Sequence, residues 1–198
     1  LFNPSHLDYI DPVLLGSVRG RQDRYADTQE KSQYAIGVMI HGDASFSSQG
    51  VIAETLTMSQ PPAYSVCSVI HIITNNQIGY TTSNPTDARS SRYCTGIAKS
   101  IEAPIVHVNG DDAEAVIRCV DFAFAYRQAF KKDVVLDIVG YRRHGHNEAD
   151  EPRVTQPIEY GIIKSHPNPS AIYAKQLVDA GIINDAQVKQ WTTDYRDK

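Results

Sequence analysis

The chain has few features of a disulfide-stabilised, nucleic-acid-binding or membrane-anchored protein. Its 198 residues include three cysteines, Cys67, Cys94 and Cys119, and their odd number and wide spacing match neither disulfide pairs nor a zinc site. A net charge of -4 gives no basis for binding nucleic acid or an anionic membrane. No apolar run is longer than a strand, so we expect no membrane span. The cysteine usage indicates a reducing compartment.

The amino terminus also lacks expected features. The first residue is Leu1 and no signal-peptide pattern follows, so we expect the chain to start inside a longer polypeptide or to have been trimmed. Hydrophobic residues make up 41% of the chain and charged residues 21%, which is ordinary for a globular protein. A chain of this length is long enough for one α/β domain with a real core.

Four β-prone runs alternate with helical patterns in the middle of the chain. The expected strands are 34–40, 69–74, 105–108 and 134–139. The expected helices between them are 47–59, a short one over 95–101, and a strong one capped by Asp111 with Glu114 in capping-box position. The β-α-β-α-β-α-β order predicts an α/β fold with an open parallel sheet and helices on both faces.

The two ends of the chain complete the expected organisation. Residues 1–33 form a lead-in with one helix, for which Asp11 is the N-cap and Pro12 the first helical residue. Residues 34–156 form the α/β module, which ends in a charged loop. Residues 157–198 form a helical tail, in which Ser170 starts a helix that Gly181 closes. Asn184 and Gln187 then predict a capping box for a last helix.

Two short strings at strand ends carry the chemistry. His41-Gly42-Asp43-Ala44 follows the first expected strand, and 75–79 (NNQIG) follows the second. Ligands of open parallel sheets bind at the carboxyl ends of the strands. Asp43 repels a phosphate unless a cation lies between them, and Mg²⁺ prefers oxygen ligands. The Asn76 amide oxygen and a nearby backbone carbonyl, for which Ile78 is the candidate, predict a magnesium–diphosphate site.

Each string also has an ordinary structural interpretation. Gly-Asp is more often a simple turn, and Asn-Asn more often a loop cap, so either one alone has a high false-positive risk. The two strings together, on successive strand ends of one βαβ unit, are much rarer by chance.

The surrounding residues add a resemblance to a known family. The chain resembles the thiamin-dependent decarboxylating component of the 2-oxoglutarate dehydrogenase complex, over nearly its whole length. The strings that carry the likeness are 2–7, 41–44, 49–51, 75–79 with 81–82, 87–91, 103–105, 107–109, 130–134 and 141–148. The departures are Asp8 for Glu, Ser48 for a glycine, 66–68 for a glycine-rich turn, Tyr80 for Phe, and Gly140 for a cysteine. None of them removes a proposed ligand, and Ser48 stands at the expected helix start beside the diphosphate.

The resemblance implies the site residues as follows: Asp43, Asn76 and the Ile78 carbonyl hold Mg²⁺; Ala44 and Ser45 contact the diphosphate; Ser5 and Leu7 lie near the thiazolium and the substrate; and His146, with His6 close to it, lies in the active site. Without the likeness, the charged loop around His146 reads better as a solvated surface. With it, proton transfer or binding of an anionic intermediate is the better interpretation of His146.

The remaining histidines and arginines have structural interpretations. His41, His71 and His107 are expected to be satisfied core or edge residues, His144 a structural residue and His166 a surface residue. Arg142 and Arg143 either attract a dicarboxylate, stay in solvent, or pair with Glu148 or Asp150.

The resemblance further implies an activity, cofactors and partners. The activity is decarboxylation of 2-oxoglutarate with thiamin diphosphate and Mg²⁺, followed by transfer of the succinyl unit to the lipoyl domain of a dihydrolipoyl succinyltransferase. A pyrimidine-binding domain, absent from this chain, and a homodimer are expected, in the cytoplasm or, in a eukaryote, the mitochondrial matrix. Two alternatives stay open: a relative that acts on 2-oxoadipate, and a non-catalytic cofactor-binding or assembly module.

Overall fold

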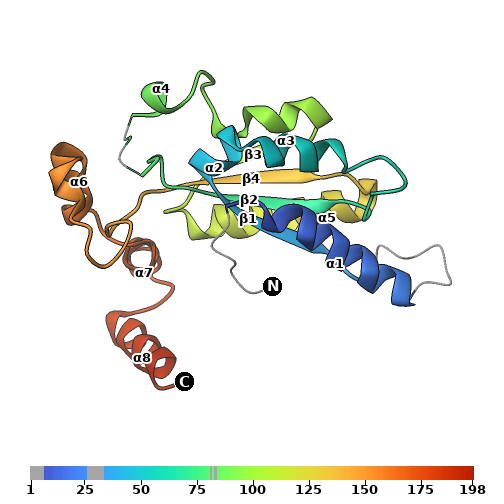
Figure 1. Cartoon of the computed structure of the whole chain (residues 1–198). Coiled ribbons are helices and arrows are strands. Elements are labelled where there is room, and N and C mark those ends of the chain that lie inside the picture. Colours follow the sequence, from blue (N-terminus) through green and yellow to red (C-terminus); the bar gives the residue numbers. More distant parts are fainter. Residues whose placement is uncertain (1–6, 26–33, 81, 83) are drawn as a thin grey trace.

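The structure, a computed structural model, describes residues 7–25, 34–80, 82 and 84–198. Within them the chain forms a four-stranded sheet with helices around it (Figure 1). The elements are α1 (Ile10–Tyr25), β1 (Gly37–Gly42), α2 (Asp43–Ser48), α3 (Gly50–Thr57), β2 (Val69–Asn75), α4 (Pro85–Ala88), the 3-10 helix η2 (Cys94–Ile101), β3 (Ile105–Asn109), α5 (Ala113–Phe130), β4 (Val134–Val139), the 3-10 turn η3 (Pro152–Val154), α6 (Pro157–Ser165), α7 (Pro169–Asp179) and α8 (Asp185–Arg196).

The sheet is open and parallel, as the sequence predicts. Its strand order is β1-β2-β4-β3, and every neighbouring pair is parallel. The register aligns Gly42 with Thr74 and Asn75 with Val139. The carboxyl ends of β1, β2 and β4 therefore lie next to one another along one edge of the sheet.

Helices cover both faces of the sheet, which confirms the predicted layers. Side chains alternate between the faces along a strand. On one face, Ala123 of α5 packs against Ile70, Val134 and Leu136. The opposite face packs against α2, α3 and η2 in a cluster made of Phe46, Ile52, Leu56, Ile73, Cys94, Ala98 and Val135. A third cluster joins Leu15 and Val18 of α1 to Met39 and Val69 of the sheet.

The helix expected over 47–59 is in fact two helices, which corrects the prediction. α2 begins at Asp43, directly after β1, and ends at Ser48. Gln49 then adopts an extended conformation, with φ -82° and ψ 124°, and α3 begins at Gly50. Apolar spacing cannot reveal such a break, because the two helices continue the same buried side. The short α4 and the 3-10 character of η2 also escape the pattern.

Three predicted helix caps are wrong, and two of them share a physical reason. Asp11 lies inside the first turn of α1, and its carboxylate faces His41 instead of capping the helix. Asp112, rather than Asp111, caps α5 by accepting from the Ala115 amide. Asn168, rather than Ser170, caps α7. In the first two cases a tertiary partner, His41 or His166, holds the carboxylate that local rules assign to the helix.

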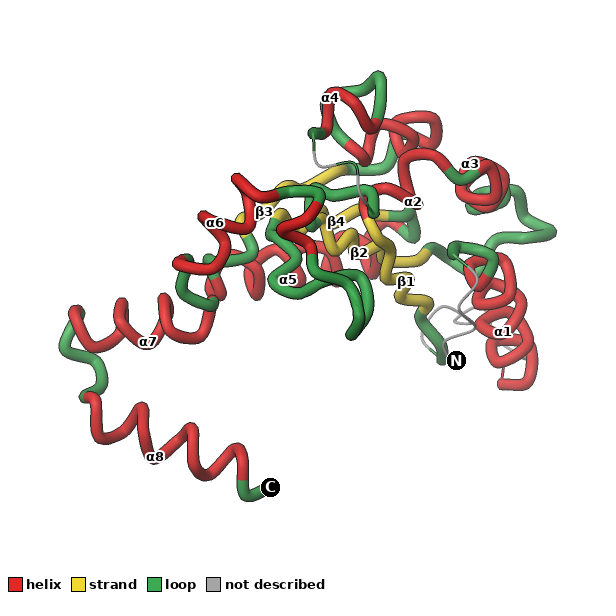
Figure 2. Tube along the Cα trace, turned by 60° about the vertical axis from the view of Figure 1, so that its left-hand side comes forward, coloured by secondary structure: helices red, strands yellow, loops and turns green. Residues whose placement is uncertain are grey.

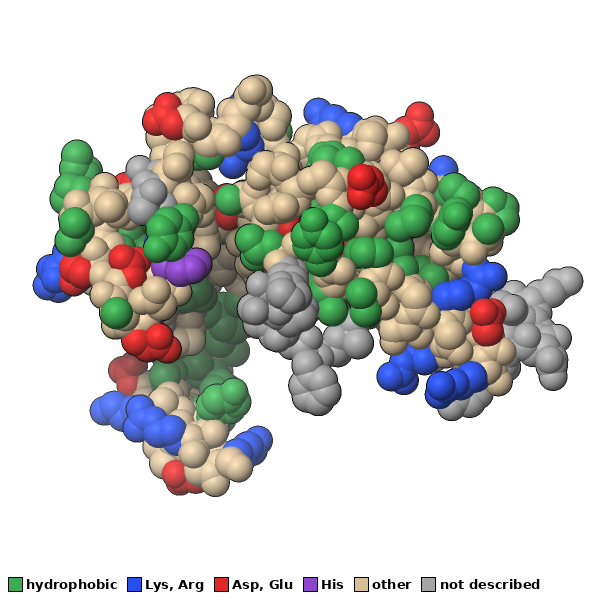
Figure 3. All heavy atoms as spheres, viewed as in Figure 1, with side chains coloured by type: hydrophobic (Ala, Val, Ile, Leu, Met, Phe, Trp, Pro, Cys, Tyr) green, Lys and Arg blue, Asp and Glu red, His purple; other side chains and the backbone are tan. Residues whose placement is uncertain are grey.

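The carboxyl-terminal helices α6, α7 and α8 form an arm that extends away from the sheet (Figure 2). Asn184 and Gln187 make the predicted capping box, and Gly181 has the left-handed φ of 70° that follows a helix end. Only a few contacts tie the arm to α5, among them a hydrogen bond from Tyr173 Oη to Glu114. Large apolar side chains of the arm are exposed: Ile158, Ile162, Ile182, Trp191 and Tyr195. Figure 3 shows hydrophobic side chains at several places on the visible face.

Among the helices of the described residues, none is both long and apolar enough to cross a membrane.

Candidate functional site

The predicted magnesium site lies where β1 and β2 end side by side. Gly42 and Thr74 are aligned across the two strands, and Thr74 Oγ1 donates to the His41 carbonyl at 2.9 Å. Asp43 follows β1 as the first residue of α2. Asn75 is the last residue of β2, and Asn76 follows it. The parallel register thus brings together two strings that are about thirty residues apart in the chain.

The Asp43 carboxylate is buried and points to the second string. Its side chain is 4% exposed. Burial raises the pKa of Asp43 above its usual range, although the backbone N–H groups of Asp43 and Asn76 and the charge of Arg89 oppose the rise. A buried acid with little compensating charge is suited to bind a cation.

Two consecutive side-chain turns shape the loop after β2. Asn75 Oδ1 accepts from the Gln77 N–H and Asn76 Oδ1 accepts from the Ile78 N–H, both at 3.1 Å. Gln77 adopts a left-handed φ of 63°, and its side chain donates to the Gly140 carbonyl at 2.9 Å. The Asn76 oxygen keeps a second lone pair, so its turn does not prevent it from binding a metal.

The two loops also touch through their small residues. A Cβ on Gly79 would lie 3.5 Å from the Ala44 Cβ, which places Ala44 against the second string. Ser45 is buried and its hydroxyl donates to the Gly42 carbonyl at 3.0 Å. Ile78 is buried as well. The structure therefore brings together five of the predicted residues: Asp43, Ala44, Ser45, Asn76 and Ile78.

Arg89 is a site residue that the sequence reasoning did not assign. Its guanidinium lies 4.0 Å from the Asp43 carboxylate, and its side chain is 11% exposed. Its Nε is buried and has no hydrogen-bond partner among the described residues. A buried guanidinium N–H without a hydrogen-bond partner, next to the carboxylate of a predicted metal ligand, fits an anionic ligand such as a phosphate group. Arg89 and Asp43 are far apart along the chain, so the sequence does not reveal their contact. The only sequence signal for Arg89 is that it belongs to the string 87–91.

The donor set at this edge fits a magnesium–diphosphate group. Asp43 and Asn76 provide a carboxylate and an amide oxygen, and the Ile78 carbonyl is a third oxygen in the same loop. Such hard oxygen ligands are those that Mg²⁺ takes. Arg89 adds positive charge for phosphate oxygens. A metal–diphosphate site requires an acidic ligand for the metal and a cationic group for the phosphate oxygens, and Asp43 and Arg89 provide these two groups.

His146 lies on a separate loop that approaches the second string. It is exposed, its ring is 4.6 Å from that of Tyr80, and its backbone N–H donates to Asp150 at 2.9 Å. An open cavity of about 790 Å³ is lined by residues 143–148 and 150–153 together with α6. A second cavity, of about 280 Å³, lies between residues 76–78, Tyr141, Arg142 and α6. His146 and the loop 76–78 thus face neighbouring openings, which share Tyr160 and Ile163 as lining residues.

The remaining residues singled out from the sequence differ in where the structure places them. Ser5 and His6 lie outside the described residues, and Leu7 is exposed. His41 and His71 are buried and hydrogen-bonded, as expected for core histidines. Arg142 donates to Tyr160 Oη and to the Tyr80 carbonyl. Arg143 donates to Tyr141 Oη and to the His166 carbonyl, so these bonds link the loop to α6.

Comparison with known proteins gives a consistent result. The family model described as "Dehydrogenase E1 component" matches residues 6–198. The chain is 55% identical over 196 residues to the 2-oxoglutarate dehydrogenase E1 component of Haemophilus influenzae, and 55% identical over 197 residues to that of Coxiella burnetii. It is 52% identical over 196 residues to that of Azotobacter vinelandii. These alignments cover 99%, 100% and 98% of the chain.

The alignments cover only 21%, 21% and 20% of these three relatives, so the chain spans about a fifth of their length.

Proposed function

The chain belongs to the dehydrogenase E1 component family, and we propose that it forms the magnesium- and diphosphate-binding part of a thiamin-dependent 2-oxoglutarate dehydrogenase. One observation carries the proposal: the buried Asp43 carboxylate lies at the edge shared by two parallel strands, and the loops that follow these strands meet where a Cβ on Gly79 would lie 3.5 Å from the Ala44 Cβ. This contact joins the two strings in one site.

The residues at this edge have distinct proposed tasks. Asp43, Asn76 and the Ile78 carbonyl hold Mg²⁺, while Ala44, Ser45 and Arg89 lie on the side of the diphosphate. Thiamin diphosphate, when bound, supplies the electron sink for loss of carbon dioxide. The protein orients the cofactor, keeps Asp43 in a dry site where its charge acts strongly, and excludes bulk water with the packed loops 42–45 and 76–79.

His146 is proposed to act on the substrate side of the site. Its ring is exposed and borders the larger cavity, so it can reach a bound 2-oxo acid. An imidazole there either moves a proton or binds an anionic group at neutral pH. His6, in the segment that precedes the described residues, is proposed to lie close to it. Leu7, with Ser5, is proposed to lie near the thiazolium.

The substrate and the partner proteins follow from the relatives' names. We infer that the intact enzyme takes 2-oxoglutarate and passes the succinyl unit to a lipoyl group on a succinyltransferase. Residues 34–156 form the binding module, and a pyrimidine-binding domain outside this chain completes the site. The exposed apolar side chains of α6 and α8, and of Ile182 between α7 and α8, support the proposal that the tail packs on other parts of a larger, homodimeric enzyme.

The direct test is magnesium-dependent binding of thiamin diphosphate to the full-length protein. Asp43→Ala and Asn76→Ala should each weaken cofactor binding by about 10-fold or more, because each removes a metal ligand. Asp87→Ala and Asn84→Ala are matched controls, since they remove the same side-chain types from the exposed α4 turn nearby. Wild-type affinity in both site variants would contradict the assignment.

Two kinetic measurements separate the alternatives. Comparing 2-oxoglutarate with 2-oxoadipate as substrates of the full-length protein distinguishes the two dehydrogenases by their kcat/KM ratio. Assaying the 198-residue chain with an artificial electron acceptor tests whether the module acts alone. We expect no turnover by the isolated chain, because its described part contains a single parallel sheet and hence no second α/β domain.

A further inference from the structure

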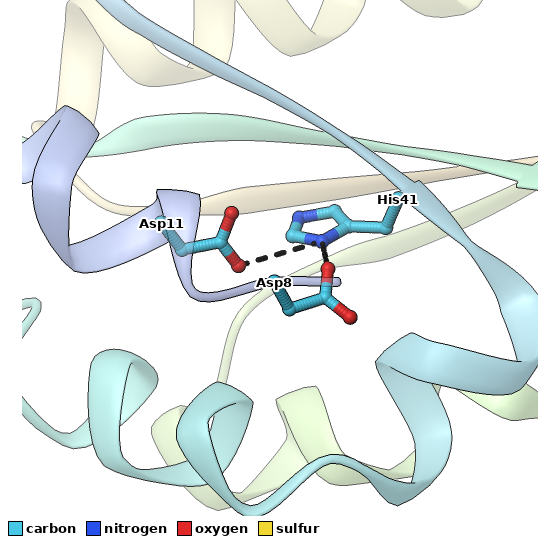
Figure 4. Close-up of side chains that lie close together, drawn as sticks. All are labelled: Asp8, Asp11 and His41. Carbon is cyan, nitrogen blue, oxygen red and sulfur yellow. Dashed lines mark hydrogen bonds and ion pairs between the residues drawn. The ribbon is translucent and has the colours of Figure 1, made fainter. Parts of the chain in front are cut away.

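A buried pair of carboxylates clamps His41, the residue two positions before Asp43 (Figure 4). Asp8 Oδ1 lies 2.9 Å from His41 Nδ1, and Asp11 Oδ2 lies 3.5 Å from the same nitrogen. The side chains of His41, Asp8 and Asp11 are 0%, 5% and 3% exposed. The predicted magnesium–diphosphate site does not use this cluster, and local sequence rules assign Asp11 to a helix cap instead.

The cluster continues into the sheet through a second histidine. His41 Nε2 lies 3.1 Å from His71 Nδ1, and the two rings stack with centroids 5.3 Å apart. His71 Nε2 in turn lies 3.5 Å from Asp133 Oδ2. A row of buried polar groups therefore runs from the start of α1, across β1 and β2, to the residue before β4. All its members are buried, so water does not compete for these contacts.

The Asp8 end of this row holds a strained turn. Asp8 has a left-handed φ of 56°, which residues other than glycine adopt at a cost. The turn is closed by the Tyr9 N–H to the Leu7 carbonyl at 2.7 Å, and by the Asp11 N–H to the Asp8 carbonyl at 3.0 Å. A buried hydrogen bond to His41 compensates for that conformation and holds the turn 7–9 against β1.

We propose that the Asp8–His41 contact is a latch that holds the turn 7–9 against the end of β1, next to Asp43. Asp8 and His41 are thus positioning residues for the substrate side of the site, to which Leu7 belongs. This inference rests on the proposed function.

The same three side chains could suggest a metal site, since their ligand atoms lie within 4.8 Å of one another. The 2.9 Å contact is instead an ordinary hydrogen-bond distance between a ring N–H and a carboxylate. Hydrogen bonding accounts for the Asp8–His41 contact without a cation.

The test combines hydrogen–deuterium exchange with kinetics on the full-length protein. Asp8→Ala should raise amide exchange in a peptide over residues 7–14 and lower kcat/KM for 2-oxoglutarate by about tenfold or more, because a small displacement of a positioning segment is costly. Thiamin diphosphate and Mg²⁺ titrations should match the wild type. Asp8→Glu, the residue type that the resembled family carries here, should restore both the exchange and kcat/KM.

Asp111→Ala is the matched control, because it removes a comparable carboxylate–histidine contact, the 2.7 Å pair with His166, far from the segment before α1. It should leave exchange over residues 7–14 unchanged. Wild-type exchange and kcat/KM in Asp8→Ala would overturn the latch, and so would an equal loss of cofactor affinity, which would indicate damage to the whole module. If the wild-type protein fails to bind thiamin diphosphate, the proposed function fails, while the exchange comparison still decides the latch.

Discussion

The Asn75 side-chain amide donates a 2.9 Å hydrogen bond to Asp137 Oδ1, which joins the loop after β2 to the middle of β4. Asp137 Oδ2 accepts from His107 Nδ1 at 2.7 Å, and Asp137 is 1% exposed. With its amide held in this way, Asn75 turns its oxygen to the Gln77 N–H. Asp137 therefore orients the turn that presents Asn76, although it is not itself a proposed ligand.

The first prediction follows from this contact. Asp137→Ala removes the carboxylate acceptor of the buried Asn75 amide, and an unsatisfied buried group costs about 1–3 kcal/mol. The His107 ring loses the same acceptor but is partly exposed to solvent. We expect lower stability and weaker magnesium-dependent binding of thiamin diphosphate. Asp137→Asn, which keeps one acceptor oxygen, should lose less. Urea unfolding and cofactor titration measure both effects, and Asp121→Ala on the exposed side of α5 is the control. Unchanged cofactor affinity in Asp137→Ala would rule out the orienting role.

The second prediction concerns the loop that carries His146. A Cβ on Gly145 would lie 2.2 Å from the Asp150 carbonyl oxygen, so Gly145→Ala must displace this backbone. Because His146 is the next residue, kcat/KM of the full-length enzyme should fall by about 10-fold or more, while cofactor affinity stays near its wild-type value. Gly161→Ala on α6 is the matched control, since its added Cβ meets nothing within 4 Å. Normal kinetics in Gly145→Ala would argue against a role for His146.

The third prediction concerns pH. Burial raises the pKa of Asp11 to about 6, helped by the charge of Asp8 and opposed by His41. The folded chain then binds more protons than the unfolded chain between about pH 4 and 6, so stability falls as pH rises through this window. Two pKa units correspond to at most about 3 kcal/mol.

Asp11→Asn removes this titration, since its side chain carries no ionisable proton. The unfolding free energy of the variant, measured relative to that of the wild type, should therefore increase from pH 4 to pH 7. Urea unfolding at several pH values measures the difference, and Asp121→Asn serves as the control. A difference that is independent of pH would show that Asp11 is ionised throughout the range.

The fourth prediction concerns the thiols. Burial, together with the charges of Asp137 and Asp43, raises the pKa of Cys94 to about 12, and its side chain is 1% exposed. The thiolate is the reactive form, so Cys94 should resist alkylation in the folded protein. Cys67 and Cys119, which are partly exposed, should react first. Mass spectrometry after iodoacetamide treatment distinguishes the three, with the urea-unfolded chain as the control in which all react. Early labelling of Cys94 would mean that the loops over Asp43 open readily.

The strings 41–44 and 75–79 could be predicted as a magnesium site because the patterns that locate them extend over only a few residues of the chain. Apolar β-prone runs mark β1 and β2, and a parallel sheet places the residues after them at one edge. Asp43 and Asn76 could therefore be paired from the chain alone. Arg89 could not, since its contact with Asp43 depends on how the 79–93 loop folds back, and no periodicity describes that path. The break at Gln49 was hidden for a related reason, because the two helices share one buried side.

The sequence by itself determined the order of strands and helices, the parallel sheet and the pair of strings at its edge, since side-chain periodicity and helix caps act over a few residues. Only the tertiary structure decided which carboxylates cap a helix and which pair with a histidine. Asp11 meets His41, and Asp111 meets His166, across 30 and 55 positions of the chain. Such partners gain from burial, where a hydrogen bond is stronger than in water, and burial exists only once the sheet and its helices have packed.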